Sequence, residues 1–488
     1  MHNLTILLFF PLFGAGIIAL LRRDQEPLIR YVAMGISLGT LLFAFGLLAL
    51  FDPSSASLQL AEYYQWNPRL GTHYSLGIDG FSYPMVLLTT VLNFIAILAS
   101  TNIKNQVKGY YMLLLALETA TLGVFMAQDW IMFYLFWEMT LIPLFFLIDK
   151  WGGANRGGAS INFVLYTMGG SVFILISLLA LMDATHAHTF EISVLVDSAQ
   201  HLGVETTVFI FIGFLVGFGV KIPIFPIHGW LPLAHVEAPS PVSILLSGIL
   251  LKMGAYGLIR AVQMLPMAVE KLQPFLVALA FINLIYGALL AWRQRDLKGM
   301  IAYSSISHMG VVLLGIATLN VLGWLGAIMQ MVAHGLVAAI LFLMIGLLYE
   351  RTHTRDVEQY SSLILVTPHF AFFTVLAFVA AIGLPGTTSF IAELHILLGG
   401  FERWGWWMIL LMLGVLINAT YAVRTIGRLF TGPVRPAMQH IHDLLPHERI
   451  AASILVIGIL VLGIYPDSAL KLMRASVDHV GFLLVGSY

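Results

Sequence analysis

Apolar runs of roughly 20 residues recur along the whole chain, and short joints that are polar or contain glycine and proline separate them. A transmembrane α-helix needs roughly 20 apolar residues, so each run predicts one membrane span. The pattern predicts about 14 such spans. They lie at 4–21, 32–51, 78–100, 109–127, 129–148, 162–183, 207–235, 241–262, 274–292, 300–317, 322–349, 361–400, 405–423 and 450–465.

The composition agrees with a bundle of membrane helices. Of the 488 residues, 59% are hydrophobic and only 10% are charged, whereas about 25% of the residues of a soluble chain are charged. Such a chain cannot cover an aqueous surface with polar groups, which excludes a soluble enzyme, a nucleic-acid-binding protein and a disordered chain. The longest joints, at 52–77, 184–206 and 424–449, are too short for a separate soluble domain. The sequence therefore predicts an all-α integral membrane protein.

The basic residues indicate how the chain crosses the membrane. If the N-terminus lies outside, most of the 24 lysines and arginines fall in joints that face the cytoplasm, as the positive-inside rule requires. A different number of spans would remove this excess of basic residues on the cytoplasmic side, so we expect both ends of the chain on the outer side. We interpret residues 1–21 as the first span rather than a cleaved signal peptide, because no basic region precedes them and no small-residue cleavage site stands out.

The chain contains no cysteine. This excludes cysteine-ligated iron–sulfur clusters, cysteine-type zinc sites, disulfides and thiol catalysis. A bis-histidine haem is not favoured, because no two spans carry matched histidines, and no phosphate-binding or hydrolase motif is present. We therefore expect no cofactor and no metal in this chain.

Two of the predicted spans contain interruptions. The run VKIPIFPIHGWLP holds Pro223, Pro226 and Pro232, and the run IGLPGTTSFIAELH holds Pro385 and Gly386. Proline lacks the N–H that a helix needs and clashes with the preceding turn, so both spans are expected to be broken helices. Ordinary proline kinks that neighbouring helices tolerate are the alternative interpretation.

The interruptions also suggest how the chain is divided. Each interrupted span is the last but one of a block of five spans, and matching interruptions in two blocks are typical of inverted repeats that carry function at the middle of the membrane. Residue identity between the blocks is too weak to prove a repeat. The expected parts are N-terminal helices at 1–108, a first five-helix repeat at 109–262, a second five-helix repeat at 274–423, and a C-terminal loop with the last helix at 424–488.

Five charged side chains lie in the interior of the predicted spans, away from the span ends, and they are the most informative feature of the sequence. A charge at the bilayer centre costs roughly 2.5–3.5 kcal/mol, so five unpaired charges would cost on the order of ten kcal/mol. We therefore expect these groups to be paired, neutral or in contact with internal water. They are Glu118, Glu138, Lys221, Lys252 and Glu393.

The choice of lysine at two of these positions favours proton transfer. A buried ammonium can release its proton, whereas a guanidinium cannot. Glu138 beside Lys221 would form a switch, because moving the carboxylate away makes the lysine release its proton. The same pair would otherwise serve only to fix the register of two helices.

The onward route would use Lys252 as the next acceptor and Glu393 as the group that passes the proton to the outside. His308 (SISHMG) and His334 (MVAHGL) lie in spans and titrate near neutrality, so they would bridge the gaps together with water. A single buried histidine is also a common interior group with a structural role, and this alternative applies to both.

Four further side chains are candidates for a supporting role. Glu118 would be a second acid near the route or a purely structural acid. The other three cluster at the break after Lys221, where they would either line the route or cap freed backbone groups. They are His228, His235 and Glu237.

These motifs resemble those of a known family. The chain is similar to the antiporter-like, proton-translocating subunits of respiratory complex I and its relatives, above all to bacterial subunit M, the mitochondrial subunit numbered four and the D-type homologue of cyanobacteria and chloroplasts. The resemblance covers roughly residues 75–430 and implies 14 helices in two inverted five-helix repeats, each with a broken helix. The matching stretches are FYLFWEMTLIPLFFLIDKWGG, VKIPIFPIHGWLPLAHVEAPSPVSILLSGILLKMGAYGLIR, LKGMIAYSSISHMG and QMVAHGLVAAILF.

The resemblance implies roles for the buried groups. In that family the residue matching Glu138 pairs with the lysine matching Lys221, and Lys252 holds the central lysine position. Glu393 stands where sister subunits have lysine and the M type has glutamate. The resemblance further implies proton translocation driven by electron transfer in partner subunits, which would hold the quinone site and the iron–sulfur clusters. The remaining partners would be the lipid bilayer, protons and internal water.

Several alternatives remain. Multisubunit cation/proton antiporters share the same helices and charges, so a subunit of such an antiporter is the second candidate function, and a structural spacer is the third. The stretches YTMGGSVFIL and SSISHMG resemble the cyanobacterial version of the family, some members of which serve complexes for carbon dioxide uptake. The expected location is accordingly a bacterial plasma membrane or a cyanobacterial thylakoid membrane.

Overall fold

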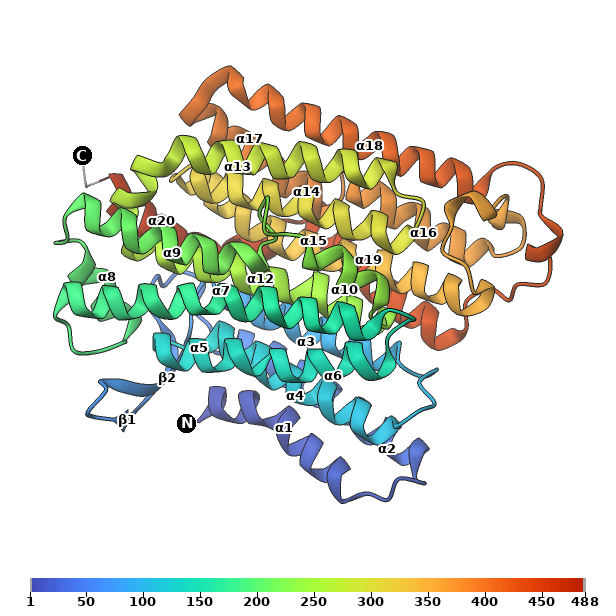
Figure 1. Ribbon diagram of the computed structural model, residues 1–488, viewed down its shortest axis with the longest axis horizontal. Helices are drawn as coiled ribbons and strands as arrows, with labels where there is room; N and C mark the ends of the chain where they lie inside the picture. The colour runs from blue at the N-terminus through green and yellow to red at the C-terminus, as the bar shows by residue number, and fades with distance from the viewer. Residues whose placement is uncertain (1, 486–488) are drawn as a thin grey trace.

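The computed structural model describes residues 2–485 and is mostly helical, with nearly all helices running along the long axis of the molecule (Figure 1). Short 3₁₀ segments and turns connect the helices. The helices are α1 (Asn3–Leu20), α2 (Glu26–Gly46), α3 (Tyr83–Leu98), α4 (Val107–Met126), α5 (Trp130–Met139), α6 (Leu141–Trp151), α7 (Arg156–Thr185), α8 (Ile192–Ala199), α9 (Val204–Lys221), α10 (Trp230–Glu237), α11 (Ser240–Leu245), α12 (Leu251–Met264), α13 (Pro266–Arg293), α14 (Leu297–Ala317), α15 (Val321–Thr352), α16 (Pro368–Ala381), α17 (Thr388–Trp404), α18 (Ile409–Phe430), α19 (Pro446–Ile464) and α20 (Asp467–Val485).

Within the described residues, twelve helical segments are long and apolar enough to cross a membrane. One of them, Thr388–Phe430, contains both α17 and α18, and two apolar helices, α3 and α16, are shorter than the rest. These lengths and compositions confirm a membrane protein with many helical spans. The expected number of about 14 spans stays a prediction.

Both expected interruptions are present. Between α9 and α10 the chain leaves the helix at residues 222–229, where the Phe225–Pro226 peptide bond is cis. Between α16 and α17 it leaves the helix at residues 382–387, where Gly383 and Gly386 adopt positive φ. The prediction of two broken helices is therefore confirmed, whereas the boundaries of the two repeats are still a prediction.

A β-hairpin departs from the all-α expectation. Strands β1 (Gln59–Asn67) and β2 (Thr72–Ile78) pair antiparallel, with Tyr64 opposite Tyr74. It occupies the polar joint 52–77, where its many polar side chains hide the alternation that marks a strand. The helix expected at 78–100 consequently begins only at Tyr83, after a turn in which the Asp79 carboxylate accepts hydrogen bonds from the backbone of Phe81 and Ser82.

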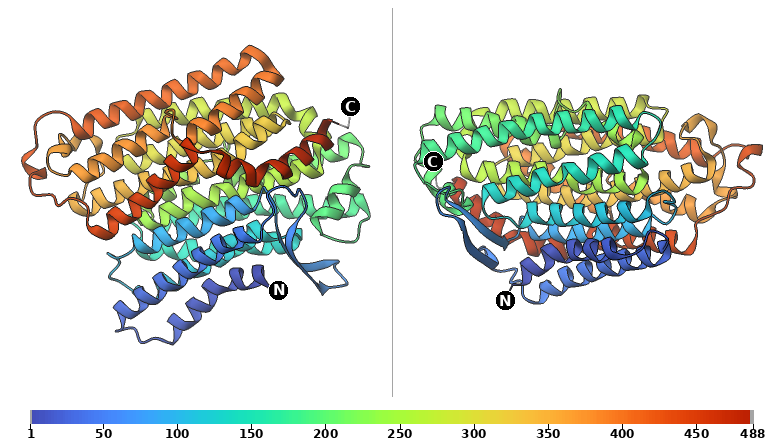
Figure 2. Two further views of the ribbon diagram at one scale, coloured as in Figure 1. Left: turned by 180° about the vertical axis from the view of Figure 1, so that it is seen from behind. Right: turned by 60° about the horizontal axis from the view of Figure 1, so that its bottom comes forward.

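Helix α20 is a second element that the hydropathy pattern does not predict. Its charged residues lower the hydropathy of the segment after 465, although its helical face is amphipathic. In the left view of Figure 2, α19 and α20 lie in red across the face nearest the viewer. The Ser476 hydroxyl of α20 accepts a hydrogen bond from the Gly80 N–H, which ties α20 to the end of the hairpin.

Helix α15 forms the centre of the bundle. It packs against α14, α17, α11, α16, α19, α20 and α3, and every side chain from 323 to 348 is buried. A Cβ at Gly326 would lie 2.8 Å from the backbone nitrogen of Ile396, so α15 and α17 approach to backbone contact there. At the other end of α15, Arg351 forms an ion pair of 2.5 Å with the buried Glu448 in the first turn of α19.

The two ends of the bundle differ. One end carries the hairpin, α8 and the beginning of α1, whose Leu4 N–H donates to the Glu62 carboxylate of β1 (Figure 1). The opposite end carries the joint at 431–445, which includes Arg435, His440 and His442. The positive-inside rule predicts that the hairpin end lies outside, and below we call it the outer end.

Candidate functional site

The first buried centre lies at the break after α9. Lys221 is the last residue of α9 and is fully buried. Its Nζ donates a hydrogen bond of 3.1 Å to the Thr140 hydroxyl and lies 3.8 Å from the centre of the Trp137 ring. The hydroxyl and the face of the ring both stabilise a cation in an otherwise apolar environment.

Glu138 lies close enough to Lys221 for its charge to act on the lysine. Among the described residues, however, the two side chains form no ion pair, and Glu138 Oε1 has no hydrogen-bond partner. Thr140, at the junction of α5 and α6, takes the contact with the ammonium that Glu138 was expected to make. Direct pairing of Glu138 with Lys221 would need a movement of the carboxylate, and the predicted switch stays a prediction.

The second centre is built around Lys252. Lys252 lies in α12 directly after the π-helical turn Leu246–Leu250, a rare element that occurs frequently at functional sites. Its Nζ donates a hydrogen bond of 2.6 Å to the Ser247 carbonyl and lies 2.6 Å from Nδ1 of His334 in α15. A protonated Lys252 makes Nδ1 the acceptor and assigns the ring hydrogen of His334 to Nε2.

A row of side chains continues from this centre. The rings of His334 and His308 in α14 are 5.5 Å apart between centroids, and His308 Nδ1 lies 4.0 Å from Glu393 Oε1 in α17. The four members, Lys252, His334, His308 and Glu393, are 0–6% exposed. The first contact is a direct hydrogen bond, and each of the other two gaps can be closed by one water molecule or a side-chain rotation. The structure therefore brings four of the six predicted relay residues into one row, and Lys221 with Glu138 forms a separate centre.

The supporting candidates are spread over three places. Glu118 in α4 is fully buried, and neither carboxylate oxygen has a hydrogen-bond partner. His228 stacks on Phe225 at the break after α9, with ring centroids 5.9 Å apart, and its Nδ1 has no partner. The structure assigns neither of them to the row from Lys252 to Glu393.

His235 and Glu237 occupy α10 but differ in environment. His235 is fully buried and stacked on Phe342 of α15 at 4.6 Å, and neither ring nitrogen has a hydrogen-bond partner. Glu237 instead accepts a hydrogen bond from the backbone of Asn155, and its carbonyl accepts one from Gly153. Glu237 thus holds the loop between α6 and α7, rather than backbone groups of the break after Lys221.

Sequence reasoning missed four polar groups, three of which are Thr140, Ser247 and Lys298. Thr140 and Ser247 are hydroxyl residues in apolar runs and carry no signal of their own. The positive-inside pattern treats Lys298 as a cytoplasmic charge, but it is 3% exposed and donates to the Ala238 carbonyl at 2.7 Å. Its position beside the predicted span 300–317 is the available hint.

The end of α12 holds a fourth such group. The same pattern treats Arg260 as an outer charge, yet it is 5% exposed and forms an ion pair of 2.6 Å with Asp79. Its place inside the predicted span 241–262 is the hint in the sequence.

Two family profiles match the chain. Residues 127–418 match the family described as NADH:quinone oxidoreductase/Mrp antiporter, TM, and residues 40–124 match the amino terminus of NADH-ubiquinone oxidoreductase chain 4. Together they cover the spans that carry all the predicted site residues.

Two curated relatives match nearly the full length. NAD(P)H-quinone oxidoreductase chain 4 2 of Thermosynechococcus vestitus is 42% identical, over 96% of this chain and 89% of the relative. NADH-quinone oxidoreductase subunit M of Rhodobacter capsulatus is 37% identical, over 98% of this chain and 96% of the relative.

Solved structures share the fold. A chain of respiratory complex I from Thermus thermophilus with bound NADH is 29% identical, with a TM-score of 0.89 and 99% of both chains covered. A chain of the Mrp complex from Dietzia has a TM-score of 0.84 at 22% identity, and the match covers 99% of this chain but only 56% of that one. The second likeness is one of fold alone.

Proposed function

Because this chain belongs to the NAD(P)H-quinone oxidoreductase chain 4 (subunit M) family, we propose that its buried Lys, His and Glu side chains carry protons across the membrane in a complex I-like enzyme. The chain is an integral membrane subunit of a large complex, and electron transfer takes place in other subunits. Protons enter near Lys221 and Glu138, pass Lys252, His334 and His308, and leave by Glu393.

The observation that carries this proposal is the contact between Lys252 and His334. An Nζ–Nδ1 distance of 2.6 Å joins two groups that can both gain and lose a proton, and both side chains are buried. A purely structural lysine in an apolar bundle would be expected beside a carboxylate. Among the described residues Lys252 has no ion pair with a carboxylate, which favours proton transfer over the role of a structural spacer.

The quinone site and the iron–sulfur clusters belong to partner subunits in this proposal, because a chain without cysteine cannot ligate such clusters in the usual way. Its relatives come from cyanobacteria and from Rhodobacter capsulatus. The thylakoid membrane and the plasma membrane are both compatible with them, as is a complex for carbon dioxide uptake.

The decisive experiment replaces Lys252 with methionine, which keeps the length of the side chain and removes the charge. Vesicles containing the assembled complex would be supplied with electron donor and quinone, and protons translocated per electron pair would be measured. Lys150→Met, at an exposed lysine near the end of α6, is the matched control. We expect the proton yield to fall in Lys252→Met alone, and an unchanged yield would refute the relay.

Purification of the tagged chain in mild detergent separates the alternatives. Co-purifying quinone-site and iron–sulfur subunits agree with the redox-driven pump. A set of small hydrophobic antiporter subunits would instead identify a cation/proton antiporter. The Glu138→Gln variant tests the hypothesis that the chain is a structural spacer. That hypothesis predicts lower stability with intact proton transport.

A further inference from the structure

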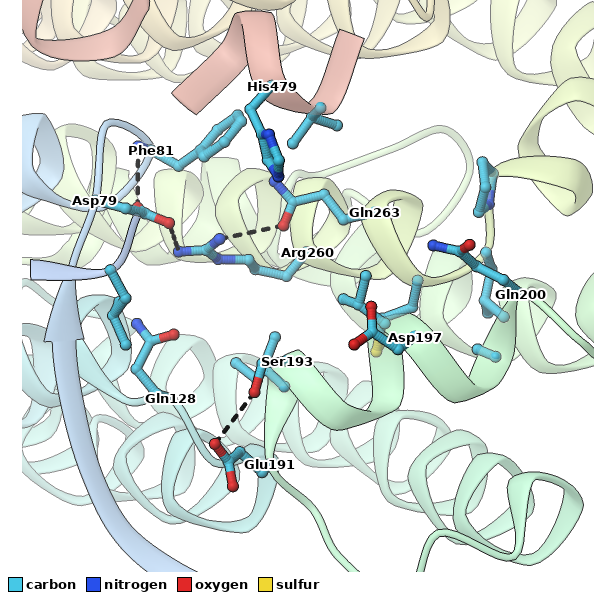
Figure 3. Close-up of a pocket in the computed structure, with 18 of the residues that line it drawn as sticks. Asp79, Phe81, Gln128, Glu191, Ser193, Asp197, Gln200, Arg260, Gln263 and His479 are labelled. Carbon is cyan, nitrogen blue, oxygen red and sulfur yellow. Dashed lines mark hydrogen bonds and ion pairs between the residues drawn. The ribbon is translucent and has the colours of Figure 1, made fainter. Parts of the chain in front are cut away.

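A cavity of about 410 Å³, lined by both polar and apolar side chains, opens at the outer end of the bundle. Its walls come from segments far apart in the chain: the hairpin with its following turn, α8, the end of α12 and α20 (Figure 3). Exposed Asp197, Gln200 and His479 lie at the rim, while Asp79 and Arg260 lie buried at the floor. The volume is enough for on the order of ten water molecules, and the lining offers them partners.

The guanidinium of Arg260 at this floor is fixed on every side. Nη2 donates to Asp79 Oδ2 at 2.6 Å and to the Tyr256 hydroxyl at 3.0 Å. Nε also donates to Tyr256, at 3.1 Å, and Nη1 donates to Gln263 at 3.1 Å. The guanidinium carbon lies 5.5 Å from the centre of the Phe81 ring and 5.0 Å from that of Tyr256. Because four hydrogen bonds hold it, this cation has a single orientation.

Arg260 lies on the same helix as the central lysine. Lys252, Tyr256 and Arg260 are four residues apart in α12, a spacing that places them on one face of the helix. Eight residues of α-helix correspond to about 12 Å. Arg260 lines the cavity, whereas Tyr256 and Lys252 do not and are fully buried. The cavity therefore reaches Arg260 but not Tyr256 or Lys252.

The hydrogen bonds at this boundary run in one direction. Arg260 donates to the Tyr256 hydroxyl, and that hydroxyl donates to the Phe125 carbonyl at 3.2 Å. A carbonyl cannot pass a proton on, and a guanidinium does not release one in a protein. The Tyr256 ring also packs edge-on against Phe125 at 5.4 Å, which closes the space beside it.

We propose that Arg260, held in place by Asp79 and Tyr256, seals the central Lys252 from the outer cavity and prevents protons from leaking back along α12. This inference rests on the proposed function, because it assumes that Lys252 lies on the proton route. The guanidinium keeps its proton, and its ion pair with Asp79 holds it between the cavity and Tyr256, so it cannot relay protons from the cavity to Lys252. Glu393 is then the only exit for protons on the proposed route, and the cavity does not connect to Lys252.

The test measures passive proton conductance. Vesicles with the assembled complex, with electron transfer inhibited, would receive an imposed pH gradient, and its decay would be followed with an entrapped dye. We expect decay at least about tenfold faster in Arg260→Gln than in the unmodified complex. Arg474→Gln, at an exposed arginine of α20, is the matched control and should be as tight as the unmodified complex. In the double variant Arg260→Gln with Lys252→Met, the pH gradient should decay as slowly as in the unmodified complex.

An Arg260→Gln complex with the same proton conductance as the unmodified complex would overturn the proposal. Increased proton conductance that persists in the double variant, which lacks Lys252, would also overturn it. A loss of packing alone would lower the yield of assembled complex and would not make the leak depend on Lys252.

A second measurement needs no change at Arg260, in case that variant fails to assemble. Because the chain has no cysteine, one introduced cysteine can be followed on this subunit by mass. Ser193→Cys, at an exposed position in the wall of the cavity, should react with a charged thiol reagent added from the outer side, and Met253→Cys, beyond Arg260, should not. An unreactive Ser193→Cys or a reactive Met253→Cys would overturn the seal. A normal proton yield in Lys252→Met would refute the proposed function without altering this labelling result.

Discussion

His308 Nδ1 and Glu393 Oε1 are 4.0 Å apart across the interface of α14 and α17. This separation is too long for a hydrogen bond and short enough for one water molecule or a small side-chain rotation to close. His308 Nε2 is buried without a partner, so the ring has a second nitrogen ready for such a link.

Glu393→Gln is therefore expected to abolish proton translocation through this subunit while the complex still assembles. The amide keeps the size of the side chain but cannot accept and release a proton. Glu393→Asp keeps the acid and widens the gap to His308 by about one methylene, so a partial loss is expected. Protons translocated per electron pair in vesicles provide the measurement, and a glutamine variant that pumps normally would contradict the role of Glu393.

Gly383→Ala should also disturb the Glu393 carboxylate, at its other oxygen, Oε2. A Cβ at Gly383 would lie 2.6 Å from Glu393 Oε2, and the φ of +77° disfavours any side chain. Gly386→Ala is the control, because its φ of +95° imposes similar strain while its Cβ would meet nothing within 4 Å. We expect both variants to lower thermal stability, by about 1–2 kcal/mol, but only Gly383→Ala to lower the proton yield.

Lys221→Arg tests whether the first centre must release a proton. Arginine keeps the positive charge over the Trp137 ring but retains its proton. We expect proton translocation to fail nearly as completely as in Lys221→Met. Thr140→Val, which removes only the hydroxyl partner, should cost about 1 kcal/mol of stability and leave transport largely intact. A Lys221→Arg complex with the normal proton yield would contradict the switch.

Asp443 provides a prediction outside the membrane spans. Partial burial would raise the pKa of Asp443, but hydrogen bonds from the backbone and ring of His369 and from the N–H groups of Leu444 and Phe370 outweigh it and hold this pKa below 3.8. The carboxylate therefore stabilises the folded chain at pH values above 3.8, and this stabilisation is lost as the pH falls through the folded-state pKa.

Asp443→Asn should accordingly lower the stability near pH 7 by about 1 kcal/mol, because the carboxylate caps the beginning of α16. The difference between the two proteins should shrink as the pH falls below 3.8. Thermal unfolding of the purified complex at several pH values would measure it. A difference that stays constant over the whole range would show that the charge of Asp443 does not contribute.

The sequence predicts the helices and their interruptions because hydropathy and proline act locally. It also predicts the members of the row from Lys252 to Glu393, since charges and histidines in apolar runs are conspicuous. Their order depends on which faces of α12, α14, α15 and α17 meet, and no local pattern contains that information. Thr140 could not be found, because a hydroxyl in an apolar run usually bonds to its own backbone.

The outer end of the bundle is the least predictable part. The hairpin and α20 have mixed polar and apolar residues, so their hydropathy resembles that of a loop. Arg260 at the end of a span looks like an ordinary interfacial charge, and only the hairpin turn that brings Asp79 to it reveals its burial. Contacts between segments that far apart are set by the packing of the whole chain.

Because α15 is long, a small tilt around one of its ends displaces residues far from that end. The ion pair of Arg351 with Glu448 fixes one end, and His334 lies 17 residues away, about 26 Å along the axis. A tilt of about 2° around that end displaces His334 by about 0.9 Å, which would lengthen its 2.6 Å contact with Lys252 to the limit of a hydrogen bond. A movement of α19 that tilted α15 by this amount would therefore break the contact between Lys252 and His334 and interrupt the proposed proton path.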